Sequence, residues 1–277
     1  MIRISRVLAV AATEFRMAAR NRWVFLSTLV FLLFSLALSF PGVGAAAMKA
    51  DVLTLASAAL ATLAVYLVPL IALLLAYDSF AGEVERGTLA LILATPVRRG
   101  ELVAGKFLGL FGVLAIALVT GLAVSTLAAG AVYGFAPAGL AAMARLTLTA
   151  LMLGAVFLAA GIAVSVAARR TGTAAATVFG LWLLAVVLWD LALLAGVVAD
   201  ADGFFARSVF PWLVIANPGD AFRIYNLAAL GDGVQMAGID SVAHTLPFDP
   251  AAALAVLAAW FAILIGCGQI LLRRLTP

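Results

Sequence analysis

The sequence predicts an all-α membrane protein with six transmembrane helices. Of its 277 residues, 66% are hydrophobic and 11% are charged, whereas a soluble domain is about half apolar and about a quarter charged. The mean hydropathy is +1.21. The apolar residues form solid runs, and a run of about 20 residues crosses the ~30 Å hydrocarbon core as a helix. Solid runs exclude a transmembrane β-barrel, whose strands alternate in polarity.

Six apolar runs are long enough to be spans within a single transmembrane domain covering residues 1–277. They are predicted at residues 23–41, 54–77, 107–132, 146–168, 174–199 and 251–272. A cleaved signal peptide is an alternative interpretation of the first run. The leader before that run is about 22 residues long and the run exceeds a usual signal core, so a span is favoured.

The basic residues predict how the spans are oriented. With the N-terminus in the cytoplasm, 13 of the 17 Lys and Arg residues lie on the cytoplasmic side, as the positive-inside rule requires. Both termini are therefore expected in the cytoplasm. The net charge of +4 then reflects topology and contact with anionic lipid heads, and no nucleic-acid partner is expected.

The leader, residues 1–22, is predicted to be an amphipathic helix that lies in the membrane interface on the cytoplasmic side. Its apolar residues recur at intervals of three and four, and Arg6, Arg16 and Arg20 fall on the opposite face. A basic face of this kind suits a helix that contacts lipid heads. The helix is expected to fix the angle of the first span.

The cytoplasmic segment between the second and third spans, residues 78–106, is predicted to contain a short helix that docks on a partner. Gly82 is expected to break the second span. Glu83 and Glu85 are expected at the start of the new helix, because carboxylates stabilise a helix N-terminus. Residues 89–93 are five apolar residues in a row, which a plain connector would not need.

The same segment ends in a near match to a phosphate-binding loop, at residues 100–106. The position after the Gly-Lys pair, where Ser or Thr would hold Mg²⁺, is Phe107. A true phosphate loop also follows a buried strand of an α/β domain, and this segment leads into a membrane span. ATP binding is therefore not expected, and Lys106 is predicted to snorkel at the cytoplasmic edge of the third span.

Asp190 lies deep in the fifth span, where a carboxylate is costly and is a functional candidate by default. It is a candidate for the transport path, and three roles are open: it carries a proton, pairs across a subunit interface, or lies near enough to the outer face to reach water. No nucleophile, histidine or enclosed polar pocket accompanies the carboxylates, so no catalytic residue is predicted and the chain is not expected to be an enzyme.

The longest external loop, residues 200–250, is predicted to hold short helices that dip into or lie on the outer leaflet. Pro211 and Pro218 divide its apolar part into pieces too short to span. Asp220 is expected to cap a helix after the turn at residues 217–220. Asp220 and Arg223 are the candidates for contact with a periplasmic partner.

Metal binding has weak support in the sequence. The chain has one cysteine and one histidine, too few for a conventional zinc site. Met48, Met236 and His244 are external and are weak candidates for a soft metal such as Cu(I). No cofactor is expected on this chain.

Residues 66–109 resemble the second span, coupling segment and third-span entry of the type-2 ABC exporter permeases. That resemblance, carried by the Glu-x-Glu-x-Gly-Thr motif at residues 83–88, implies the permease fold of that family in a bacterial inner membrane. It implies a homodimer and two separate ATPase subunits, which would bind ATP and Mg²⁺. It also implies that the ATPase docks on the coupling helix at Glu83, Glu85, Arg86, Gly87, Thr88 and Leu89.

A narrower resemblance is to the permeases of the Nos-type transporters, which serve the copper sites of nitrous oxide reductase in denitrification. It is carried by LLLAYDSFAGEVERGTL, by DLALL at residues 190–194 and by NPGDAFRIYN at residues 217–226. It implies a periplasmic β-helical partner of the NosD type. Three alternatives remain: a permease that exports a drug or lipid, a proton-coupled secondary transporter that uses Asp190, and a structural anchor.

Overall fold

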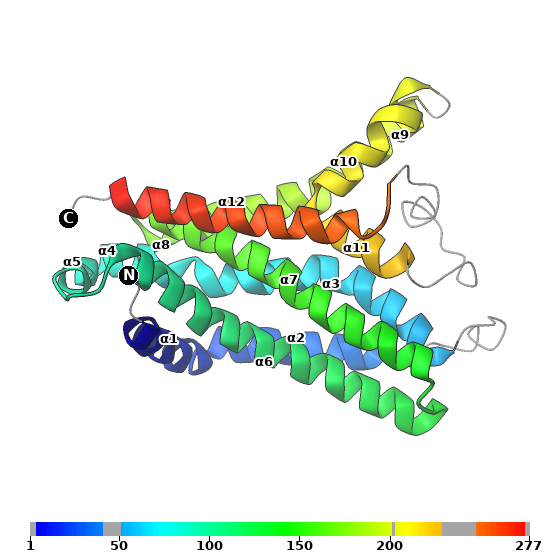
Figure 1. Ribbon diagram of the computed structural model, residues 1–277, viewed down its shortest axis with the longest axis horizontal. Coiled ribbons are helices and arrows are strands. Elements are labelled where there is room, and N and C mark those ends of the chain that lie inside the picture. Colours follow the sequence, from blue (N-terminus) through cyan, green and yellow to red (C-terminus); the bar gives the residue numbers. More distant parts are fainter. Residues whose placement is uncertain (1–3, 41–50, 201–202, 229–247, 275–277) are drawn as a thin grey trace.

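The computed structural model describes residues 4–40, 51–200, 203–228 and 248–274, and every regular element in these ranges is helical (Figure 1). The long helices run side by side in one bundle. Helices α1 (Ile4–Ala19), α4 (Asp78–Glu85) and α5 (Thr88–Leu93) lie at one end, and α9 (Trp189–Ala199) and α10 (Phe210–Ala216) lie at the other. The predicted all-α class is confirmed.

Five helical segments of the described chain are long and apolar enough to cross a membrane. They correspond to the predicted spans two to six, and most begin earlier than predicted. The segments are α3–α4 (Val52–Glu85), α6 (Arg99–Tyr133), α7 (Pro137–Ala167), α8–α9 (Thr171–Ala199) and α12 (Ala252–Arg274).

The predicted first span corresponds to α2 (Arg22–Leu38), which has 17 residues. It passes the length and composition test for a span only together with α1, from which it is bent by 71°. The described part of the chain therefore has up to six spans. The predicted leader helix is confirmed as α1, which packs along α6.

Two glycines of α6 let α1 approach closely. A Cβ on Gly105 would lie 2.6 Å from the Cβ of Val10, and one on Gly109 would lie 2.5 Å from the carbonyl oxygen of Ala11. Because a side chain at either position would push the helices apart, these glycines place α1 against the start of α6.

The helix after the second span differs from the prediction. Gly82 does not break it, because α4 follows α3 (Val52–Ala76) after Tyr77 alone and runs through Gly82 to Glu85. The break comes at Gly87, whose φ of 70° suits glycine. Glu83 and Glu85 consequently lie in the last turn of α4 and not at a helix start.

The fifth span contains an irregularity that the sequence did not reveal. Between α8 (Thr171–Trp182) and α9 the backbone forms a π-helical segment, η2 (Leu183–Leu188). The indole nitrogen of Trp182 donates a hydrogen bond to the carbonyl of Tyr66 at 3.0 Å, which ties this span to α3. Insertions of this kind are frequent at functional sites.

The predicted short helices after the fifth span are confirmed. A second π-helical segment, η3 (Phe205–Val209), leads into α10, and α11 (Pro218–Ala228) follows. Helix α9 and the η3–α10 segment project from the bundle (Figure 1). Helix α11 contacts α3, α7 and α12 and is mostly buried, so it dips into the bundle.

Candidate functional site

A buried cluster of three charged residues lies at the α1–α4–α5 end of the bundle. The Nζ atom of Lys106 donates a hydrogen bond to Oε1 of Glu83 at 2.7 Å and another to Oε1 of Glu14. Lys106 is only 1% exposed, and its Nζ lies 5.1 Å from the centre of the Phe80 ring, within cation–π range. We call Lys106, Glu14 and Glu83 the Lys106 cluster.

The Lys106 cluster corrects the prediction that Lys106 snorkels to the membrane edge. Its ammonium group is enclosed because Glu14 of α1 and Glu83 of α4 both reach it. Each residue comes from a different helix, so the cluster joins the leader, the coupling segment and the third span. Sequence reasoning missed Glu14. The available signal was one carboxylate on the otherwise apolar side of an amphipathic helix.

The charges of the Lys106 cluster do not balance. One ammonium faces two carboxylates, and Oε2 of Glu83 has no hydrogen-bond partner among the described residues. A buried ion pair is stable only when its remaining polar atoms are satisfied. The cluster is therefore a place where a further donor would be favourable.

Helix α4 is also anchored to α7 by a single hydroxyl group. Oγ of Ser165 accepts hydrogen bonds from the backbone nitrogens of Phe80 at 2.9 Å and Ala81 at 3.0 Å, and it donates to the carbonyl of Tyr77 at 2.6 Å. These bonds satisfy backbone groups at the start of α4, which otherwise lack helical partners. Ser165 thus fixes the place where the coupling segment leaves the span.

Glu85 links the coupling segment to the fifth span. Its Oε2 accepts hydrogen bonds from the backbone nitrogen of Thr171 at 2.8 Å and from the Thr171 hydroxyl at 2.6 Å. Thr171 is the first residue of α8, where unpaired N–H groups favour a carboxylate. Movement of α4 would therefore be passed directly to α8.

The predicted docking residues divide between a buried and an exposed side. Glu83 and Leu89 are buried, Thr88 is half-buried, and the remaining three are exposed. Leu91 of α5 is 71% exposed. An outward surface results, which we call the α5 surface and which consists of Glu85, Arg86, Gly87, Ala90, Leu91 and Ala94.

The apparent phosphate loop at residues 100–106 has a helical backbone, in the first turns of α6. Its backbone N–H groups therefore enter the helix and do not form a cradle for phosphate. Glu101 of this segment accepts a hydrogen bond from the backbone nitrogen of Arg98 at 3.0 Å. The segment starts a span, as the sequence argument required.

A second buried cluster lies at the opposite end, where α11 meets the fifth span. The guanidinium of Arg223 donates to both carboxylate oxygens of Asp190, at 3.3 and 3.4 Å, and to Oδ1 of Asp220. Asp220 is 1% exposed and Arg223 is 5% exposed. We call Arg223, Asp190 and Asp220 the Arg223 cluster.

The Arg223 cluster corrects two predictions. Asp220 and Arg223 face the inside of the protein and cannot offer a partner their charged groups, because each is paired with the other. Asp190 is engaged by Arg223, whose guanidinium donates hydrogen bonds to both of its carboxylate oxygens. This pairing argues against Asp190 as a lone proton carrier.

Asn217, and not Asp220, caps α11. Its Oδ1 accepts from the backbone nitrogen of Gly219 at 2.7 Å, while its Nδ2 donates to the carbonyl of Ala185 at 2.7 Å. Ala185 belongs to η2, so the cap also holds α11 on the π-helical segment. Sequence reasoning missed this role, although the polar residues recur at intervals of three, at Asn217, Asp220, Arg223 and Asn226.

The metal candidates Met48, Met236 and His244 lie outside the described residues. Within the described ranges, no group of three or more His, Cys, Asp or Glu side chains is arranged to hold a metal ion.

The chain is similar to known proteins along almost its whole length. The model of the ABC-2 family transporter proteins matches residues 8–274. A probable ABC transporter permease protein NosY of Pseudomonas aeruginosa is 38% identical over 271 residues, which cover 97% of this chain and 98% of that one. One of the same name from Stutzerimonas stutzeri is 35% identical over 277 residues, covering 99% and 100%.

Proposed function

The chain belongs to the ABC-2 transporter family, and on that premise we propose that separate ATPase subunits dock on its α5 surface and move its spans. It is a multi-pass membrane permease subunit of an ABC transporter. The proposed division of labour puts ATP and Mg²⁺ in the ATPase subunits. This chain then binds no cofactor and catalyses no reaction.

The observation that carries the proposal is that the exposed α5 surface adjoins a helix, α4, which is firmly held to the bundle. Leu91 is exposed on a short helix, whereas the adjoining α4 is anchored by the Lys106 cluster and by Ser165. A partner that covered Leu91 would therefore bear on a fixed support. A push on α5 would reach α1, α6 and α7 through these anchors, and α8 through Glu85.

The far end of the bundle is suited to receive that motion. Helices α3 and α8–α9 run from the end of the bundle that holds α4 and α5 toward the end that holds α11 (Figure 1), and α3 contacts α11. There α11 is held to η2 by Asn217 and to α9 by Arg223. A shift of the fifth span would therefore displace α11, which lies in the described part of the predicted external loop.

The finer proposal concerns what this motion serves. The resemblance to Nos-type permeases, and the NosY names of both relatives, support a role in assembling the copper sites of nitrous oxide reductase. We propose that two copies form a homodimer in the bacterial inner membrane, with both termini in the cytoplasm. A periplasmic β-helical protein of the NosD type would then meet the external surface.

The docking proposal is tested with Leu91→Asp. A carboxylate in the centre of an apolar contact should reduce recovery of the ATPase subunit with the affinity-purified chain by about tenfold or more. The protein should still fold, because Leu91 is largely exposed. Leu91→Met is the matched control and should retain the subunit. Equal recovery with Leu91→Asp would contradict docking on this surface.

The copper-site proposal is tested separately in a denitrifying host. Deleting this gene should leave nitrous oxide reductase short of copper, and restoring the chain should restore the metal content measured by elemental analysis. An enzyme with full copper in the deletion strain would reject the finer role and favour a drug or lipid exporter. Docking of the ATPase on the α5 surface would be unaffected by that outcome.

A further inference from the structure

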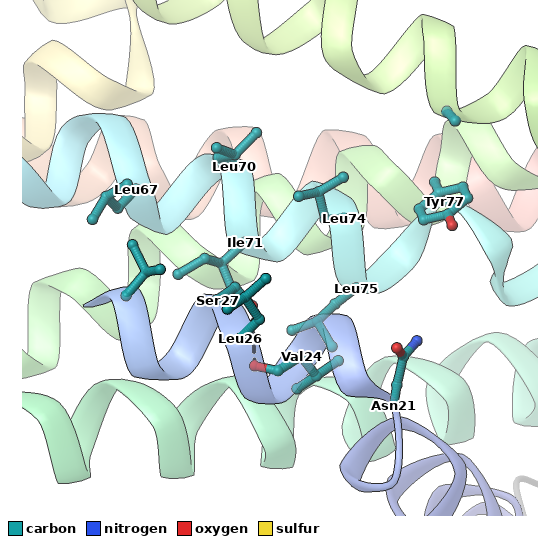
Figure 2. A pocket seen from close by; sticks show the side chains of 12 residues that line it. Asn21, Val24, Leu26, Ser27, Leu67, Leu70, Ile71, Leu74, Leu75 and Tyr77 are labelled. Atoms are coloured by element: carbon teal, nitrogen blue, oxygen red, sulfur yellow. Dashed lines mark hydrogen bonds between the residues drawn. The ribbon is translucent and has the colours of Figure 1, made fainter. Parts of the chain in front are cut away.

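Two neighbouring cavities lie beside α2 and α3. The larger has a volume of about 410 Å³ and is lined mainly by apolar side chains of these helices, among them Leu26, Leu67 and Leu70 (Figure 2). Its size is in the range of small-molecule sites. In Figure 2 the polar residues Asn21 and Tyr77 lie at one end of this apolar lining.

The smaller cavity has a volume of about 180 Å³ and lies next to that polar end. Both cavities are lined by Asn21, Val24, Leu74, Leu75 and Tyr77. The charged residues that line the smaller one are Glu14, Asp78, Glu83, Arg86 and Lys106. Because they share these lining residues, the two cavities adjoin, and together they offer a larger apolar part and a smaller charged part, as an amphiphile requires.

The charged part calls for a cationic donor. Three carboxylates line it against two cations, and Lys106 is already engaged by Glu14 and Glu83. Glu83 is 8% exposed, and its Oε2 has no partner in the described part of the chain. An ammonium group with N–H bonds would satisfy this oxygen and offset the excess negative charge.

The charged part also offers a site for an anion. Arg86 reaches Asp78 only at 3.7 Å, and its side chain is 58% exposed. A phosphate at the mouth of the cavity could accept hydrogen bonds from this guanidinium. An ammonium and a phosphate separated by a short linker are the two charges of an aminophospholipid head.

We propose that the groove between α2 and α3 binds one aminophospholipid, with an acyl chain in the apolar cavity and its primary ammonium donating to Glu83. The phosphate faces Arg86. Bound in this way, the lipid completes the Lys106 cluster and braces α2 against the coupling segment. A phospholipid is the occupant that matches both parts of the space, since neither a free amine nor a fatty acid supplies the apolar chain and both head charges.

The test uses the full-length chain, purified in detergent and titrated with dioleoylphosphatidylethanolamine or dioleoylphosphatidylcholine while bound lipid is counted by native mass spectrometry. The two lipids share their acyl chains and phosphate, but the choline nitrogen carries no N–H. Because a charged hydrogen bond is lost, choline lipid should bind about tenfold more weakly. Equal binding of the two lipids would overturn the proposal.

Two variants assign the site. Glu83→Gln should abolish the preference for the ethanolamine lipid. Leu74→Trp fills the junction of the two cavities without altering the charged residues, and it should reduce binding of both lipids about tenfold. Leu108→Trp on α6 is the matched control, because Leu74 is 45% exposed and Leu108 is 46% exposed. It should bind lipid as the unmodified chain does.

The same measurements identify other occupants. Unchanged lipid binding by Leu74→Trp would overturn the proposal, because the lipid would then sit elsewhere. No bound lipid on the unmodified chain, together with dissociation of Leu74→Trp into single copies, would overturn it in favour of contact between two copies. A preference for ethanolamine that both site variants weaken, and the control retains, would establish it.

Discussion

The two buried ion clusters contain the same set of charges, but they connect different numbers of helices. Each places one cation between two carboxylates. Lys106 takes its carboxylates from two other helices, 92 and 23 residues away in sequence. Arg223 takes one from its own helix, three residues away, and one from the fifth span. The Lys106 cluster therefore joins three helices, whereas the Arg223 cluster joins one helix to one span.

The backbones around the two clusters also differ, because one is regular α-helix and the other is partly π-helical. At the Lys106 end, Ser165 ties regular α4 to regular α7. At the Arg223 end, the fifth span is π-helical and offers the carbonyl of Ala185 to Asn217. A regular junction transmits force as a rigid unit, and a π-helical segment can change register at small cost. The comparison indicates one stiff end and one adjustable end, which under the proposed function would be the input end and the output end.

The largest effect is expected when the cation of the stiff end is removed. Lys106→Met leaves two carboxylates buried without a counter-charge, so the free energy of unfolding should fall by about 3–5 kcal/mol. Denaturant titration of the purified protein in detergent measures this change. Adding Glu14→Gln and Glu83→Gln to Lys106→Met should recover most of the loss. A loss below about 1 kcal/mol would mean that the cluster is not a structural joint.

A smaller effect is expected at the output end from Arg223→Lys. A lysine keeps the positive charge but cannot bridge Asp190 and Asp220 with a planar fork. The free energy of unfolding should fall by about 2 kcal/mol, the scale of one charged hydrogen bond. The same titration measures it, and Arg207→Lys serves as a control on the neighbouring η3. A loss as large as that of Lys106→Met would remove the contrast between the ends.

The smallest effect on global stability is expected from Asn217→Ala. It removes the cap of α11 and the hydrogen bond to Ala185, at a cost of about 1 kcal/mol. The effect that distinguishes this variant should be confined to the region around η2. Amide hydrogen exchange in η2 should become faster, while exchange in α4 should stay unchanged. Faster exchange at both ends would show that the two ends unfold together and are not mechanically distinct.

The parts of the fold that depend on apolar run length could be predicted from sequence. Five crossing segments, the leader helix and the short helices after the fifth span follow from where the apolar residues stop and start. The continuation of α3 through Gly82 could not be predicted, because the helix there is supported by Ser165, 83 residues further along the chain. Local propensity carries no information about such a contact.

The candidate site was only partly predictable for the same reason. The motif at residues 83–88 marked the coupling segment, but its division into a buried and an exposed side depends on Lys106 and Glu14. The rule that a lysine near a span edge snorkels assumes that no carboxylate faces it. Asp190 was recognised because a charge in a span is rare. Its partner Arg223 was assigned to the surface because it lies in a predicted external loop, and the sequence does not reveal its contact with Asp190, 33 residues away.

The close contact of α1 with α6 at Gly105 and Gly109 sets an order on the biogenesis of the protein. Glu14 is made 92 residues before Lys106, an interval of roughly 5–20 s at about 5–20 residues per second. Until the third span emerges, the first helix lacks both its packing surface and its counter-charge. The leader helix is therefore made before its partners and can dock against α6 only after the third span has been synthesised.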